Sequence, residues 1–92
     1  MDTISKIPIR IIKEQELVIG PMAWDEAKKV IGLTIDQAQE SASFSGDSKD
    51  IINRLVAQYE RIFGLASHAV CHDAVKDLIA KMPAEEIPSS LR

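Results

Sequence analysis

The sequence has little of what most disulfide-stabilised, secreted or membrane proteins contain. Among its 92 residues there is one cysteine, so an internal disulfide cannot form, and a single thiol is typical of a reducing compartment. No apolar run approaches the roughly 20 residues that a membrane-spanning helix needs, and no signal-peptide pattern opens the chain. We therefore expect a cytoplasmic protein without a membrane partner.

Basic charge and catalytic motifs are also scarce. Eleven Lys and Arg residues stand against fourteen Asp and Glu residues, which gives a net charge of −3. Nucleic-acid binding depends on neutralising phosphates, so this balance disfavours DNA or RNA as a partner. The signatures G-x-G-x-x-G, G-x-S-x-G, H-E-x-x-H and C-x-x-C and the P-loop are all missing. We expect no enzymatic activity and no cofactor.

The length predicts one small domain. A chain of this size buries about 60–65% of its unfolded surface, so its core is thin. Small folds are usually supplemented by a disulfide, a metal or a partner subunit. We expect a single α-rich domain over residues 1–82 and an extended C-terminal tail over residues 83–92, because Pro83 and Pro88 disfavour a helix there.

The isoleucine-rich N-terminal segment has an alternating pattern. Ile7, Ile9 and Ile11 alternate with Pro8 and Arg10, which is typical of a half-buried strand that starts at or near a sheet edge. A second short strand over residues 17–19 would complete a hairpin spanning residues 7–19.

Two short helices are expected next. The first runs from residue 21 to Gly32, with proline at its start and glycine at its end. The second runs from Ile35 to Ser43, with Thr34 as its N-cap and Gln37 three residues later, as in a capping box.

The strongest helical pattern covers residues 48–63, where apolar residues recur on one face and Asp47 or Ser48 can cap the start. A further helix is expected from Leu65 to Lys81. The apolar faces of these two segments point about 140° apart, so we expect a break at Gly64 in the left-handed region. The predicted fold is mainly α (α+β): a short N-terminal strand or hairpin followed by about four helices, the last two joined at Gly64.

One segment concentrates metal-binding residue types. His68, Cys71 and His72 stand at i, i+3 and i+4, the spacing at which helical side chains become neighbours. Zinc sites need three or four protein ligands, and the chain has no other Cys or His. Cys71 lies at the centre of its helix's apolar stripe, which favours a buried, inert thiol. The alternatives are a metal or redox site shared between subunits and catalysis by one of the two histidines.

The segment GDSKDIINRLVAQYERIFG resembles the region of carrier proteins in which an Asp-Ser-Leu motif opens a helix. The resemblance implies that Ser48 carries phosphopantetheine. Asp47 and Ser48 match the motif, whereas Lys49 stands in place of the leucine. The other interpretation of Ser48 is a helix cap. A second alternative function is a small DNA-binding regulator, because AWDEAKKVIGLTIDQAQ has the outline of a helix-turn-helix.

The function that these observations favour is a non-catalytic protein–protein interaction or regulatory module that self-associates or binds another protein. The candidate contact residues are Ile9 and Ile11 on the N-terminal strand edge. In the tail, Ile87 and Leu91 are expected to dock as two apolar anchors in a groove on the same chain or on a partner.

Overall fold

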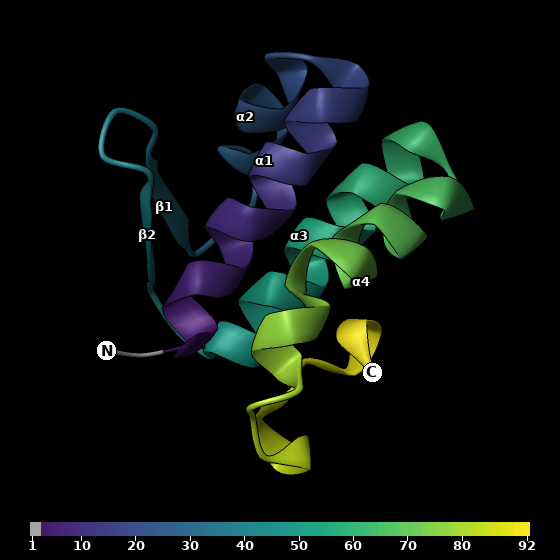
Figure 1. Cartoon of the computed structure of the whole chain (residues 1–92). Helices are drawn as coiled ribbons and strands as arrows, with labels where there is room; N and C mark the ends of the chain where they lie inside the picture. The colour runs from purple at the N-terminus through teal and green to yellow at the C-terminus, as the bar shows by residue number, and fades with distance from the viewer. Residues whose placement is uncertain (1–2) are drawn as a thin grey trace.

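The computed structural model describes residues 3–92, which form a helical fold with one β-hairpin (Figure 1). Its elements are η1 (Thr3–Lys6), α1 (Ile7–Ile19), α2 (Met22–Ala27), β1 (Leu33–Asp36), β2 (Ser41–Phe44), α3 (Ser48–Phe63), α4 (Leu65–Ile79), η2 (Ala84–Glu86) and η3 (Ser89–Leu91). The mainly α class with four helices is confirmed, but the strands lie between α2 and α3 and not at the N-terminus. Within the described residues, no helix is long and apolar enough to cross a membrane.

The predicted N-terminal hairpin over residues 7–19 is wrong, because this segment forms α1. Proline is tolerated in the first turn of a helix, where its missing N–H has no intrahelical acceptor; Pro8 occupies this turn. The buried side chains of α1 follow helical spacing: Ile7, Pro8, Ile11, Ile12 and Gln15. The alternation of isoleucine with Arg10 is also compatible with a helix, because Arg10 lies on the flank of α1 and pairs with Asp77 of α4.

The predicted helix over residues 35–43 is also wrong. Residues 33–44 form the antiparallel hairpin, with Leu33 opposite Phe44 and Asp36 opposite Ser41. The turn is closed by Asp36, whose Oδ1 accepts a hydrogen bond from the backbone N of Gln39 at 3.1 Å. Thr34 lies in β1 and does not cap a helix, because β-branched residues fit a pleated strand.

This hairpin also removes the helix-turn-helix on which the DNA-binding alternative depended. The first helix of the predicted helix-turn-helix is present as α2, which lies inside the predicted range but ends at Ala27. The following residues form turns up to Gly32, and the second helix of the motif is replaced by strands. The geometry that places a recognition helix in a groove of DNA is therefore missing from residues 24–40.

The two long helices confirm the predicted break. Asp47 is the N-cap of α3, and its Oδ1 accepts a hydrogen bond from the backbone N of Lys49 at 3.1 Å. Gly64 has a φ of +87° and separates α3 from α4. Only glycine adopts this backbone region without strain, which is why the chain reverses at that residue.

Three helices enclose the core. In Figure 1, α1 and α4 lie side by side, and α3 lies behind them. The fully buried side chains come from all three helices and include Ile11, Ile52, Leu55 and Val75. Arg10 fixes α1 to α4 with two hydrogen bonds to the carboxylate of Asp77, at 2.9 and 3.1 Å, so the packing of this pair is set by both apolar and charged contacts.

The C-terminal residues are packed on the helices and are extended at Pro83, Ile87 and Pro88. Pro83 and Pro88 have ψ values of 143° and 138°, and each is followed by one turn of 3-10 helix, η2 or η3. The prediction of an extended segment over residues 83–92 therefore needs this correction. Prolines prevent an α-helix but allow such short turns. The segment brings Leu91 into the core, where its side chain is 0% exposed.

Candidate functional site

The four residues predicted to contact a partner lie largely inside the chain. Ile11 and Leu91 are fully buried in the core, while Ile9 and Ile87 are partly buried and pack against it. Ile9 faces a shallow groove between α1 and β2. Leu91 docks as an anchor on its own chain. The surface that is free for a partner must therefore be found among other residues.

The His68, Cys71 and His72 side chains enter three different environments. Cys71 is buried and receives a hydrogen bond from Gln15 Nε2 at 3.3 Å. The Nδ1 atom of His68 lies 2.9 Å from Glu60 Oε2, whereas His72 lies at the surface beside Asp73. Within residues 3–92, no group of three or more His, Cys, Asp or Glu residues is arranged to hold a metal ion.

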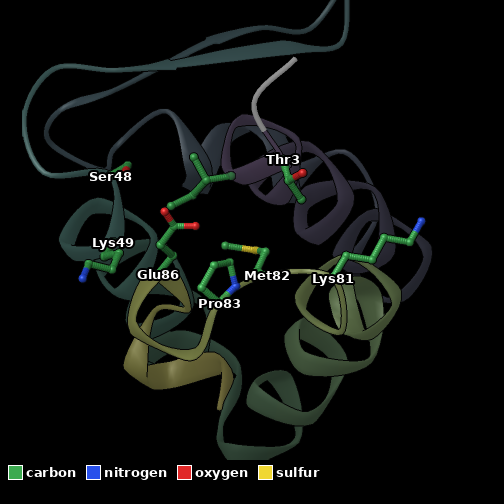
Figure 2. Close-up of a pocket in the computed structure, with 8 residues that line it drawn as sticks. Thr3, Ser48, Lys49, Lys81, Met82, Pro83 and Glu86 are labelled. Atoms are coloured by element: carbon green, nitrogen blue, oxygen red, sulfur yellow. The ribbon is translucent and has the colours of Figure 1, made fainter.

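A cleft of about 410 Å³ opens at the start of α3. It is lined by Thr3, Ile4, Ser48, Lys49, Lys81, Met82, Pro83 and Glu86. Figure 2 shows Met82, Pro83 and the Glu86 carboxylate turned toward its centre, while the amines of Lys49 and Lys81 point away from it. The two lysines therefore do not converge on a common ligand position in the cleft.

Ser48 lies at the rim of this cleft as the first residue of α3. Because Asp47 supplies the N-cap, Ser48 is not needed for capping. Among the described residues that line the cleft there is no histidine, so no Ser-His pair is formed there. The phosphopantetheine interpretation of Ser48 stays a prediction.

The most unusual surface of the molecule is apolar. We define the apolar end as five exposed large side chains at two helix corners: Leu17, Val18, Met22, Ile62 and Leu65. Leu17 and Leu65 are 81% and 76% exposed. Figure 1 shows the α1–α2 corner and the α3–α4 corner on the same side of the molecule, away from η1 and the C-terminal residues.

Hydrogen bonds hold the two corners together. Gln15 near the end of α1 donates to the backbone O of Ser67 near the start of α4, at 3.1 Å. The Tyr59 hydroxyl of α3 donates to the backbone O of Ala23 in α2. The five residues of the apolar end each lie within three positions of one of these bonded residues. These hydrogen bonds therefore hold the α1–α2 corner next to the α3–α4 corner.

The first two turns of α4 extend this surface. Ala66 and Ala69 are exposed, and Val70 is partly exposed, on the side of α4 that faces away from the core. The first charged residue on that side is Asp73. This half of α4 therefore exposes the apolar side chains of Ala66, Ala69 and Val70 beside Leu65.

The exposure of Leu17 can be predicted from the sequence, but only once α1 is assigned as a helix. Leu17 stands about 200° around α1 from the buried Gln15, at 100° per residue, so a helical α1 places it outside the core. The predicted strand over residues 17–19 gave no such exposure.

No family model, curated protein or solved structure matches this chain.

Proposed function

We propose that this protein is a non-catalytic interaction module that self-associates through the apolar end. The observation that supports it is the exposure of five large apolar side chains at one end of a small fold. Monomeric soluble proteins rarely leave contiguous apolar patches of more than a few hundred Å² open to water, and larger ones usually mark interaction sites.

A second copy of the chain is the partner that fits this surface best. The outward face of α4 carries no charge from Leu65 to Val70, so it has nothing to pair with a charged partner. A two-fold contact needs only one self-complementary patch, and an apolar patch is chemically complementary to itself. The nearest exposed charges in the chain lie outside this patch and include Glu14, Asp25, Arg61 and Asp73.

The strength of this contact can be bounded. Complete burial of one Leu, Ile, Val or Met side chain contributes about 1.5–3 kcal/mol. For five partly exposed side chains on each of two copies, the gain is on the order of 10 kcal/mol, against an association cost of roughly 4–15 kcal/mol. The surplus is therefore at most about 6 kcal/mol, and we expect a reversible dimer with a dissociation constant no lower than about 40 μM.

Sedimentation equilibrium over about 10 μM to 1 mM protein tests this proposal. The wild-type chain is expected to shift from monomer to dimer across this range. Leu65→Glu places a charge in the contact and is expected to remain monomeric. Ile31→Glu is a matched control, because Ile31 is also 81% exposed but lies outside the apolar end; this variant is expected to dimerise like the wild type.

Leu17→Glu provides a second, independent measurement at the other corner of the apolar end. Leu17 is 81% exposed, so the substitution does not disturb the core. This variant is also expected to remain monomeric, because it places a charge in the contact. A wild-type chain that stays monomeric at the highest concentration, or an Ile31→Glu variant that dissociates as readily as Leu65→Glu, would contradict the proposal.

A further inference from the structure

The C-terminal segment, residues 84–92, contacts α3 and α4 in the manner of a bound peptide. After Pro88 the chain turns back beside α4, as Figure 1 shows in yellow, and η3 packs against both α3 and α4. The segment has no α-helix or strand of its own. It is held by one apolar anchor, Leu91, which is fully buried, and by side chains of α3 and α4 that bind the two serines before it.

Asn53 of α3 makes the most specific of these contacts. Its Oδ1 accepts hydrogen bonds from the backbone N of Ser90 at 3.1 Å and from the Ser90 hydroxyl at 2.6 Å. Its Nδ2 donates to the Ser89 hydroxyl at 3.2 Å. One amide thus binds the backbone and both side chains of a Ser-Ser pair, which is how a groove selects a short peptide sequence.

His68 of α4 holds the same residue from the other side. Its Nε2 faces the backbone O of Ser90, and its Nδ1 faces the carboxylate of Glu60 at 2.9 Å. His68 thus joins Ser90 of the segment to Glu60 of α3 through its two ring nitrogens.

We propose that the groove between α3 and α4 is a peptide-binding site for a Pro-Ser-Ser-aliphatic sequence. In this structure the chain's own C-terminal segment occupies it, and the same segment of a second copy is the ligand that it takes when the tethered one leaves. A short tether gives the chain's own segment an effective concentration in the millimolar range, so the groove is self-occupied at rest. Asn53 and His68 lie outside the apolar end, and this inference does not depend on the proposed dimer.

A full-length variant with its own segment displaced tests the site. Leu91→Asp removes the apolar anchor, and binding of a fluorescent peptide with the sequence AEEIPSSLR is followed by anisotropy. The variant is expected to bind the peptide at least about tenfold more tightly than the wild-type chain, in which the tethered segment competes. A peptide carrying Ser90→Pro lacks the N–H that Asn53 accepts and is expected to bind about tenfold more weakly.

A substitution tests the role assigned to His68. In the Leu91→Asp variant, His68→Leu removes the contact to the backbone O of Ser90 and is expected to weaken peptide binding about three- to tenfold. The same substitution is expected to leave the Ser90→Pro discrimination in place, because that depends on Asn53.

Folding is checked by circular dichroism, and Leu91→Ala replaces Leu91→Asp if the charged variant is unfolded. Where neither variant folds, the wild-type chain is titrated with peptide into the millimolar range, and a saturable NMR shift of the Asn53 side-chain amide is expected. Equal binding of the native and Ser90→Pro peptides, no binding to a folded variant, or an unchanged Asn53 amide would overturn the proposal.

Discussion

Gln15 and Cys71 meet inside the core, where Gln15 Nε2 lies 3.3 Å from the Cys71 sulfur and 3.1 Å from the backbone O of Ser67. Gln15 is fully buried, and within residues 3–92 its Oε1 has no hydrogen-bond partner. A buried acceptor without a donor costs about 1–3 kcal/mol. The same side chain therefore joins α1 to α4 and weakens the fold.

Replacing this amide by an apolar side chain of similar length is expected to stabilise the protein. Gln15→Met removes the unpaired Oε1 and keeps the volume, so the free energy of unfolding is expected to rise by about 1 kcal/mol. For a domain of this size that corresponds to an increase in Tm of about 4–8 °C. Gln58→Met, at a half-buried glutamine that donates to Glu26, is the control and is expected to lower the Tm.

The Cys71 thiol is expected to be unreactive in the folded protein. Burial raises the pKa of this thiol to about 11, and the hydrogen bond from Gln15 opposes that shift only in part. Because the thiolate is the reactive form, labelling by a disulfide reagent at pH 8 is expected to be at least about 100-fold slower than in denaturant. Labelling at equal rates in both conditions would contradict the burial of Cys71.

Stability is expected to fall at alkaline pH. Burial is the main cause that raises the pKa of both Cys71 and the Tyr59 phenol in the folded state, whereas the unfolded chain titrates at about 8.5 and 10. The folded state therefore favours the neutral forms, and the stability they contribute is complete below about pH 8.5 and is lost as the pH rises. The Cys71 share is about 2 kcal/mol at pH 10.

Urea denaturation at pH 8, 9 and 10 measures this loss. In Cys71→Ala the decrease between pH 8 and pH 10 is expected to be smaller than in the wild type, although the variant starts from a lower stability because a cavity is formed. A wild-type stability that does not change over this range would contradict the argument.

Two glycines with positive φ are expected to respond differently to alanine. A Cβ atom at Gly64 meets nothing within 4 Å, so Gly64→Ala costs only backbone strain, about 1–3 kcal/mol. At Gly32, where φ is +90°, a Cβ atom would lie 2.9 Å from Ile51 Cδ1 and 3.1 Å from the backbone O of Ser45. Gly32→Ala is therefore expected to be the more destabilising variant, and urea denaturation ranks the pair.

The helices that the sequence predicts best are those whose local signals agree with their burial. In α3 the apolar spacing, the Asp47 cap and the terminal Gly64 all indicate the same element. In α1 they conflict, because isoleucine favours strands locally and a proline stands near the start. Tertiary packing against α4 decides that conflict, and packing is not visible in a local pattern.

The hairpin and the groove depend on contacts between distant residues. Thr34 and Gln37 match a capping box, yet the pairing of β1 with β2 satisfies the same backbone groups. Asn53 is separated from Ser90 by 37 positions, and no spacing rule connects them. The burial of Cys71, by contrast, follows from its position in the apolar stripe of a single helix and was predictable.

The burial of Leu91 sets the time at which this protein can complete its folding during synthesis. A ribosome delivers the chain from its N-terminus, and α1, the hairpin, α3 and α4 all emerge before residue 91. Until that residue leaves the exit tunnel, the core lacks one of its fully buried side chains and η3 is missing from the surface of α3 and α4. We therefore expect the nascent chain to pass through a helical state with an incomplete core.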